Sequence, residues 1–473
     1  MTSIGVADEF DGVRDFIRAG LVKESVPSIA VAVARDGKVI WEEGFGWADR
    51  ERRIPATEHT MYSLASISKP MTSTGLMKLV EAGKIELDKP LNDYLGFAKL
   101  QGRAGDAHEA TVRRVANHTA GLPMHYQFFY EDEAPVPPSK DETILRYGFL
   151  VTQPGERFRY SNIGTGLLSY VVERVSGQRY ADFMRREVFM PLGMTRTSVD
   201  IGPGLEPFAA TRYGADGLPI PFYELDTPGA GGVFSSAHDL IRFAQFHLKT
   251  HLRDQRAIIS DASIDEMHRP TVKGALTADD GYGVGFFVAR EHGYRVVSHG
   301  GGMAGVSTQM LIFPDEKLAL LALSNGNSSL SGEVCERIAA TQLPRWRVER
   351  QPTPAPVVST TPQQVLGEWR GQVSTYEREL PVQLRFLPGG EVRATVAEQA
   401  EALLKNPRWD GVVFTGEFNA RIGTADTERY PYKVELELTL RGGVLNGAAN
   451  ATSPVGGPRV RNSLAHWLEL KKD

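Results

Sequence analysis

Apolar residues near the start of the chain recur first with helical spacing and then with strand spacing. One helical face is predicted between residues 10 and 21, carried by Phe10, Val13, Phe16, Ile17 and Leu21. Two β-rich runs follow, SIAVAVAR and KVIWEEGFG, joined by Asp36-Gly37. This dipeptide favours a two-residue hairpin, because both central positions need a positive φ. A helix that leads into an antiparallel hairpin indicates an α+β fold.

The spacing of apolar residues differs between the middle and the late parts of the chain. From about residue 60 to 280 the pattern is mostly helical, interrupted by loops such as HTAGLP at 118 and TPGAGGVFSS at 227. Strand-like runs return between 282 and 325: YGVGFFVAR, YRVVSHGGG, STQMLIFP and LALLALSN. The simplest arrangement is an antiparallel sheet built from both ends of this region, flanked by helices, with a mostly helical subdomain between. We expect it to bring residues near 66, 160 and 300 to one cleft.

A proline-rich stretch, QPTPAPVVSTTP at 351–362, separates this region from a different pattern. Beyond it lie LPVQLRFLPGGEVRATVA, typical of a hairpin, the strand-like GVVFTGEFNARI, and KVELELTL with strictly alternating apolar positions. Several short strands with turns predict a small antiparallel β-barrel or sandwich. We therefore expect a first domain at 1–348, a linker at 349–363 and a β-barrel domain at 364–473.

Composition places the chain among ordinary globular proteins, with 41% apolar residues, 23% charged residues and a net charge of -5. No basic run favours nucleic acid, and no apolar run is long enough to span a membrane. Cys335 is the single cysteine, so neither an internal disulfide nor a cysteine-based zinc site is possible. The first residues lack the pattern of a signal peptide, so we expect a cytoplasmic protein.

No sequence motif indicates a metal or a cofactor, and we expect neither. HExxH is absent, and the run from Gly281 to Gly285 lacks both the strand-helix context of a nucleotide loop and a P-loop lysine. The remaining candidates for chemistry are three short motifs that hold a serine, a lysine, a tyrosine and a histidine.

The first motif, Ser66-Ile67-Ser68-Lys69, places a serine and a lysine three residues apart. About one Ser-x-x-Lys is expected by chance in a chain of this length, and the plain alternative is a helix N-cap serine beside a solvated lysine. Pro70 is tolerated in a first helical turn, which puts the helix start at the serine. The shared helix face would then direct the Lys69 amine at the Ser66 hydroxyl. A buried lysine has a lowered pKa and can take the serine's proton.

The other two motifs are Tyr160-Ser161-Asn162 and His299-Gly300-Gly301. Tyr160 could pass a proton to a leaving group and Asn162 could hold a substrate carbonyl, or the pair could be a packed ring and a helix cap. The glycines could let a strand approach a bound acyl group, or form only a turn. An α/β-hydrolase oxyanion loop is excluded, because no G-x-S-x-G pentapeptide is present.

In this order and spacing, the three motifs resemble those of the penicillin-recognising serine hydrolases, in the branch of class C β-lactamases, DD-peptidases and family VIII esterases. The likeness covers about residues 10–345, with LVEAGKIELDKPLNDYL, NHTAGLP and PGERFRYSN among the matching stretches. It implies a β-lactamase/DD-peptidase-like fold, with Ser66 as acyl-accepting nucleophile, Lys69 as its base and Tyr160 in proton transfer. It also implies a substrate contact at Asn162 and an oxyanion hole formed by the N–H groups of Ser66 and Gly302.

The third motif departs from that of true β-lactamases, which carry Lys-Thr-Gly where this chain has His299-Gly300-Gly301. The family's lysine helps to attract the substrate carboxylate, and a neutral histidine is a weaker anchor at pH 7. This difference shifts the expected substrate from β-lactams to small-molecule or peptide esters and amides.

Leu366-Gly367-Glu368-Trp369 resembles the Gly-x-Trp start of a lipocalin-like barrel. Such a barrel accompanies some D-aminopeptidase-type members and the penicillin-binding-protein-type thioesterases that cyclise peptides, and it could restrict the substrate or serve only for packing. We therefore expect a serine hydrolase that cleaves an ester or amide through an acyl-Ser66 intermediate. The alternatives are a D-amino-acid peptidase or cyclising thioesterase, then a true β-lactamase or a non-catalytic binding protein. The oligomeric state stays open.

Overall fold

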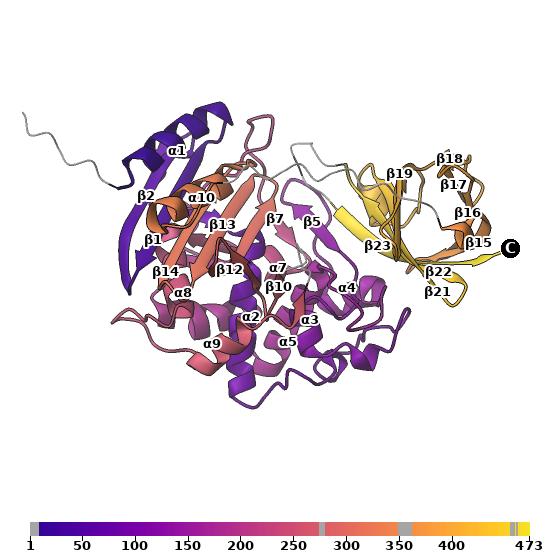
Figure 1. Ribbon diagram of the computed structural model, residues 1–473, viewed down its shortest axis with the longest axis horizontal. Helices are drawn as coiled ribbons and strands as arrows, with labels where there is room; N and C mark the ends of the chain where they lie inside the picture. Colours follow the sequence, from indigo (N-terminus) through magenta and orange to yellow (C-terminus); the bar gives the residue numbers. More distant parts are fainter. Residues whose placement is uncertain (1–8, 274–279, 349–361, 455–458, 460–461) are drawn as a thin grey trace, which may run out of the picture.

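The computed structural model describes residues 9–273, 280–348, 362–454, 459 and 462–473, which form a sheet-and-helix unit and a barrel unit (Figure 1). The first unit is built on a nine-stranded antiparallel sheet of order β3-β2-β1-β14-β13-β12-β11-β10-β9. Its strands are β1 (Ser28–Arg35), β2 (Lys38–Asp49), β3 (Ile54–Pro55), β9 (Val272–Lys273), β10 (Gly281–Tyr282), β11 (Phe287–Glu291), β12 (Tyr294–Met303), β13 (Val306–Phe313) and β14 (Leu318–Ser324). β1 comes from the start of the first unit and β14 from near its end, and the two pair. The predicted sheet, built from both ends of this part of the sequence, is therefore confirmed.

The turn between β1 and β2 is the one that the sequence predicts. Asp36 and Gly37 have φ values of 50° and 77°, as a two-residue hairpin turn requires. The run YGVGFFVAR, predicted as one strand, is instead split into β10 and β11. Gly285, with φ of 86°, lies in the break, where a Cβ atom would meet Ser73 Oγ at 2.4 Å. The break thus lets the chain approach the helix that carries Ser73.

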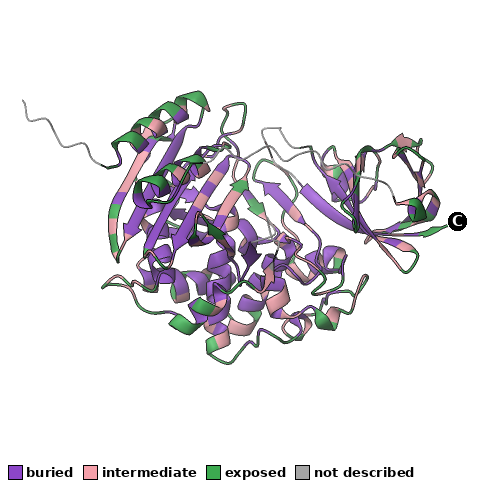
Figure 2. Cartoon of the chain, viewed as in Figure 1, coloured by how far each residue is buried: buried purple, intermediate pink, exposed green. Residues whose placement is uncertain are grey.

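Side chains of β1 alternate between the two faces of the sheet. Ile29, Val31 and Val33 join a core with α1 (Asp11–Lys23) and α10 (Leu330–Gln342). The alanines between them lie in the core on the opposite face, where α8 (Ala237–His247) packs on β1 and β14. Figure 2 shows the sheet strands mostly buried, with exposed residues gathered on the outer sides of the helices.

Residues between about 60 and 280 form a mostly helical part, as their pattern predicts, and this part lies on the α8 side of the sheet. Its helices are α2 (Ser68–Glu81), α3 (Val112–Ala116), α4 (Lys140–Tyr147), α5 (Asn162–Ser176), α6 (Tyr180–Met184), α7 (Pro228–Gly231) and α9 (Asp261–Met267). Short helical turns are η1 (Ala65–Ile67), η2 (Leu91–Asp93), η3 (Ala107–Glu109), η4 (Arg185–Phe189), η5 (Met190–Leu192) and η6 (Glu206–Phe208), and a small sheet joins β4 (Met61–Ser63), β8 (Val233–Ser236) and β6 (Thr197–Val199). In the described ranges, no helix combines the length and apolar character required to cross a membrane.

The C-terminal unit is a nearly closed antiparallel barrel of order β18-β17-β16-β15-β23-β22-β21-β20-β19. Its elements are η7 (Gln363–Val365), β15 (Gly367–Ser374), β16 (Glu379–Phe386), β17 (Val392–Val396), β18 (Ala402–Leu403), β19 (Lys405–Trp409), β20 (Val413–Phe418), η8 (Thr427–Arg429), β21 (Lys433–Arg441), β22 (Val444–Thr452) and β23 (Asn462–Lys472). Val434, Leu436 and Leu438 alternate into the core with Trp369, as the sequence predicts. Most of the predicted linker, residues 349–361, lies outside the described residues, and the domain boundaries stay predictions.

Strand pairing joins the first unit to the barrel, which the sequence pattern does not predict. β5 (Tyr126–Tyr130) pairs on one edge with β7 (Tyr223–Leu225) of the first unit. On its other side it pairs with β23 of the barrel, through Tyr126 with Ser463 and Gln127 with Asn462. The barrel sheet therefore continues into the first unit through β5.

Candidate active site

Ser66 lies in η1, the short turn that leads directly into α2. The predicted helix start near Ser66 is right to within two residues, since α2 itself begins at Ser68 and Pro70 falls in its first turn. Ala65 has φ of 47°, which is unfavourable for a residue with a Cβ atom. The chain thus turns sharply just before the serine and presents it, partly exposed, at the mouth of a buried helix.

Lys69 is 1% exposed, and its amine contacts three oxygen atoms. Nζ lies 3.1 Å from Ser66 Oγ, 2.7 Å from Asn162 Oδ1 and 2.9 Å from the Ala230 carbonyl oxygen. The amide and carbonyl oxygens can only accept hydrogen bonds, whereas the serine hydroxyl can also donate. A neutral amine has two hydrogens and one lone pair. It can therefore donate to Asn162 and Ala230 and keep its lone pair for the Ser66 hydroxyl.

The surroundings of Lys69 favour this neutral form. Burial lowers its pKa well below the usual 10.5. Its three hydrogen-bond partners are all uncharged, and no carboxylate of the described residues forms an ion pair with it. The Tyr160 ring lies against the amine, with Nζ 4.8 Å from the ring centroid.

Tyr160 and Asn162 lie at the start of α5, opposite Ser66 and Lys69. The helix cap is Ser161, whose Oγ accepts the Gly164 N–H at 3.1 Å, so the alternative that Asn162 caps the helix is wrong. Asn162 directs its amide oxygen to Lys69 and its amide nitrogen towards Met124 Sδ, 3.4 Å away. Burial raises the pKa of Tyr160 well above 10, and the neighbouring Ser66 hydroxyl offsets part of the rise. Tyr160 is therefore a neutral phenol at pH 7.

His299 is buried in β12 and does not face the cavity beside Ser66. Its Nδ1–H donates to the Gly300 carbonyl at 2.7 Å, so Nε2 accepts from the Tyr282 hydroxyl at 3.1 Å. Burial lowers the pKa of His299 to about 3, which makes the ring neutral at pH 7. The side chain predicted to bind substrate is thus fully engaged within the protein, and its role as a contact stays a prediction.

The glycines after His299 have different surroundings. A Cβ atom at Gly301 would meet the Leu64 carbonyl oxygen at 2.3 Å, so glycine here lets β12 lie against the turn before Ser66. At Gly300 it would meet the flexible Gln309 side chain at 2.8 Å. A Cβ atom at Gly302 would have no other atom within 4 Å, and this residue lines the cavity together with Ser66. The two residues of the predicted oxyanion hole therefore border the same space.

The cavity beside Ser66 has a volume of about 240 Å³ and no charged residue in its lining. The stretch Tyr126-Gln127-Phe128-Phe129-Tyr130 is rich in aromatic residues; Tyr126 and Phe128 form part of the wall, whereas Phe129 and Tyr130 are absent from it. The lining consists of Ser66, Tyr126, Phe128, Asn162, Leu225, Thr227, Ala230, Gly231, Gly302, Met303 and Asn327. No group of three or more His, Cys, Asp or Glu side chains that could hold a metal occurs in the described ranges.

Three residues at the site were not identified from the sequence. Thr227 lines the cavity with a buried hydroxyl that has no hydrogen-bond partner among the described residues. Asn327 ties the turn between β12 and β13, because its amide donates to Met303 O and accepts from Gly305 N–H. His118 accepts the Ser161 N–H at 3.2 Å, and its ring centroid lies 4.4 Å from that of Tyr160. The HTAGLP loop was visible in the sequence, but only the fold places it against Tyr160.

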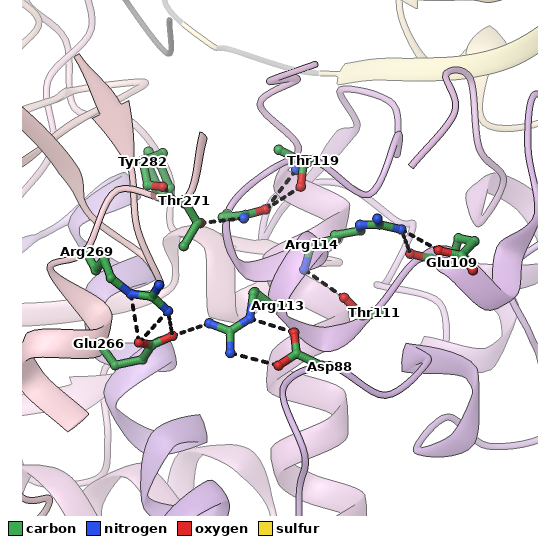
Figure 3. Close-up of polar contacts among 11 residues, drawn as sticks. Asp88, Glu109, Thr111, Arg113, Arg114, Thr119, Glu266, Arg269, Thr271 and Tyr282 are labelled. Atoms are coloured by element: carbon green, nitrogen blue, oxygen red, sulfur yellow. Dashed lines mark hydrogen bonds and ion pairs between the residues drawn. The ribbon is translucent and has the colours of Figure 1, made fainter. Parts of the chain in front are cut away.

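Ion pairs around α3 hold the beginning of the loop that carries His118. Arg113 pairs with both Asp88 and Glu266, which connects α3 to the chain after α2 and to α9 (Figure 3). Asn117, at the end of α3, donates to Thr271 Oγ1 at 2.7 Å. The segment that supports Tyr160 is thus fixed from several elements.

The first unit of the chain is similar to known proteins. The family model described as Beta-lactamase matches residues 13–343. Penicillin-binding protein 4* of Bacillus subtilis (strain 168) is 31% identical over 317 residues, which cover 62% of this chain and 67% of that protein. Protein flp of Staphylococcus aureus (strain MRSA252) is 24% identical over 341 residues, 70% of this chain and 66% of that protein. The chain thus spans about two thirds of the length of these relatives.

Solved structures share the fold, in two cases across both units. The octameric penicillin-binding protein homologue from Pyrococcus abyssi has a TM-score of 0.60 at 21% identity, covering 96% of this chain and 99% of that one. SurE with D-Leu has a TM-score of 0.65 at 22% identity, covering 97% and 99%. A class C beta-lactamase, with a TM-score of 0.61 at 20% identity, covers only 74% of this chain and 99% of its own. With the family match over residues 13–343, these findings show that the chain belongs to the beta-lactamase family of serine hydrolases.

Proposed function

We propose that this protein cleaves an uncharged carboxylic ester or amide through an acyl intermediate on Ser66. The observation that carries the proposal is the buried amine of Lys69, 3.1 Å from the Ser66 hydroxyl and without a carboxylate partner among the described residues. Such an amine is a base near neutral pH and activates the serine as a nucleophile.

The reaction has two stages. Ser66 Oγ attacks the substrate carbonyl carbon and its proton passes to Lys69 Nζ, while the N–H groups of Ser66 and Gly302 stabilise the oxyanion. Tyr160 then gives its hydroxyl proton to the leaving oxygen or nitrogen and recovers a proton from Lys69, and the acyl-enzyme forms as the bond to the leaving group breaks. In the second stage, water attacks the acyl carbon and gives a proton to the same pair of residues. The pair returns a proton to Ser66 Oγ as the bond between the acyl carbon and Oγ breaks and the acid is released.

The cavity supports an uncharged acyl group as the substrate portion next to Ser66. Its lining carries no charged side chain, so neither a substrate carboxylate nor an ammonium group has an ion-pair partner there. His299 is neutral and faces Tyr282, which argues against a role as carboxylate anchor. The Asn162 amide nitrogen, whose one hydrogen-bond contact among the described residues is to Met124 Sδ, has a second hydrogen for a bond to the carbonyl side of the substrate.

A peptide-directed activity is the second candidate. It is favoured by the likeness across both units to SurE, whose structure was solved with D-Leu. A D-amino-acid amide or a peptidyl thioester would be the matching substrate, with the acyl-enzyme resolved by water or by an amine of the same peptide. Ester hydrolysis and peptide-directed activity share the Ser66 chemistry and differ in the acyl group.

The chemistry is tested with Ser66→Ala and Lys69→Met, using Lys78→Met on the same helix as the matched control. Lys78 pairs with Glu187 at the surface, so its replacement leaves turnover intact. General-base catalysis contributes about 10²–10⁴-fold, which is the expected fall in kcat for Lys69→Met. Mass spectrometry after fluorophosphonate treatment should find the adduct on Ser66. Full turnover by Lys69→Met would contradict the assignment of the base.

A substrate panel separates the two candidates. It contains p-nitrophenyl esters of increasing chain length, D- and L-amino-acid amides, nitrocefin and a peptidyl thioester. Hydrolysis of the p-nitrophenyl esters with little turnover of the amino-acid amides and the thioester supports the first candidate, and preferred cleavage of D-amino-acid amides or the thioester supports the second. Efficient nitrocefin hydrolysis would contradict the inference drawn from the uncharged cavity and the neutral histidine.

A further inference from the structure

The cavity wall formed by β5 lies between the two units. Alternate residues of a strand point to opposite faces. Tyr126 and Phe128 line the cavity, while the alternate residues Gln127 and Phe129 contact a segment of the barrel. We name this segment, residues 424–430, the barrel loop. The same strand therefore carries the cavity wall on one face and an interface with the barrel on the other.

Asp426 of the barrel loop binds three side chains of the first unit. It accepts hydrogen bonds from Gln127 Nε2 at 3.2 Å, from Arg146 Nη1 at 2.8 Å and from the Tyr147 hydroxyl at 2.6 Å. Asp426 is 8% exposed, and hydrogen bonds to a buried carboxylate are among the stronger ones in proteins. This carboxylate joins β5 to α4 through a single group of the barrel.

Arg429 of the barrel loop binds β5 directly. Its Nη2 donates to the Phe128 carbonyl at 3.0 Å, and its guanidinium lies 4.4 Å from the Phe129 ring centroid. The side chain is 10% exposed and pairs with Glu133 just beyond β5. The N–H group of the same residue, Phe128, donates to Asn462 Oδ1 of β23 at 3.3 Å. Both main-chain polar groups of a cavity residue are thus held by the barrel.

We propose that the barrel loop positions β5 and thereby sets the width of the acyl cavity, so that the C-terminal unit selects the substrate by acyl size. The inference rests on the proposed function, because the cavity is taken as the acyl site. Arg429 and Asp426 are positioning residues, since they reach the cavity only through β5. A change of one methylene in an apolar pocket alters the rate about 10–200-fold, so a small movement of Phe128 has a measurable effect on selectivity.

The test compares Arg429→Met with Arg393→Met, a matched change at an exposed arginine of β17 whose partners Glu391 and Glu401 are both in the barrel. We measure kcat/KM for p-nitrophenyl acetate, whose acyl group has two carbons, and for p-nitrophenyl hexanoate, whose acyl group has six. In Arg429→Met the ratio of the two values should change about 10-fold, mainly through KM for the longer ester. In Arg393→Met it should stay as in the wild type.

A second variant and a second readout keep the test decisive. Asp426→Asn preserves shape while weakening the bonds to Gln127, Arg146 and Tyr147, and it serves if Arg429→Met does not fold. Hydrogen exchange of the peptide that contains residues 126–130 should become faster in either folded variant. Unchanged exchange together with an unchanged ester ratio would overturn the inference. A wild type that forms no Ser66 adduct would instead overturn the proposed function, and the exchange result would still decide whether the barrel positions β5.

Discussion

The barrel also contacts the segment next to Tyr160, and replacing Glu437 with glutamine tests what this contact does. Arg159, directly before Tyr160, is 7% exposed and forms an ion pair with Glu437 of β21. Its Nε and Nη2 atoms are buried without hydrogen-bond partners among the described residues. Its main-chain N–H donates to the His118 carbonyl at 2.7 Å. Glu437 is thus the carboxylate that compensates a buried charge one residue away from the tyrosine of the site.

The expected magnitude follows from the burial of the two partners. Removing one partner of a fully buried ion pair costs about 3–5 kcal/mol, because the other charge stays uncompensated. The Glu437 side chain is 31% exposed, so water can approach the pair and reduces the cost. We expect the free energy of unfolding to fall by about 1–3 kcal/mol in Glu437→Gln. A shift of Tyr160 should also lower kcat by about 10-fold while KM changes little.

Urea unfolding followed by tryptophan fluorescence and steady-state kinetics on one ester check both values. Glu391→Gln is the control, because Glu391 pairs with Arg393 on the exposed surface of the same barrel, with its side chain 42% exposed. The control should change neither the unfolding midpoint nor kcat. If Glu437→Gln behaves like the control in both assays, the reasoning about Arg159 is wrong. Lower stability with unchanged kcat would leave the ion pair as a stabilising contact without influence on Tyr160.

Three further predictions concern the glycines, acid stability and the pH dependence of the rate. Gly301→Ala should lower kcat/KM at least 10-fold and destabilise the fold, because its Cβ would meet Leu64 O at 2.3 Å. Gly302→Ala, where no atom lies within 4 Å, should remain as stable as the wild type in thermal unfolding. Equal stability of the two variants would contradict this. Burial lowers the pKa of His268, His299 and His466 to about 3. As the pH falls below 6.5, these histidines therefore bind protons in the unfolded state but not in the folded state. Each should lower the free energy of unfolding by about 2 kcal/mol at pH 5, measured by urea unfolding. The value of kcat/KM, measured from pH 5 to 10, should rise as Lys69 loses its proton and level off well below pH 10.5, and a rise centred at 10.5 would refute a neutral Lys69.

Local order along the chain was readable from the sequence, because it depends on residues that are close together. The Asp36-Gly37 turn follows from backbone sterics, and the alternation of Val434, Leu436 and Leu438 from the two-residue period of a strand. The contact between Ser66 and Lys69 belongs to the same class, since a three-residue spacing places both on one face of a helix.

The environment that gives these residues their properties was decided only by tertiary structure. The partners of Lys69 other than Ser66 lie 93 and 161 residues away, at Asn162 and Ala230, and burial by the fold lowers its pKa. The support of Tyr160 by His118 and the sharing of β5 between the first unit and the barrel have no local signature either. Spacing along a sequence fixes which side chains share a face of one element. Which faces meet depends on how the whole core packs, and here that packing placed the barrel against β5, the strand that lines the cavity.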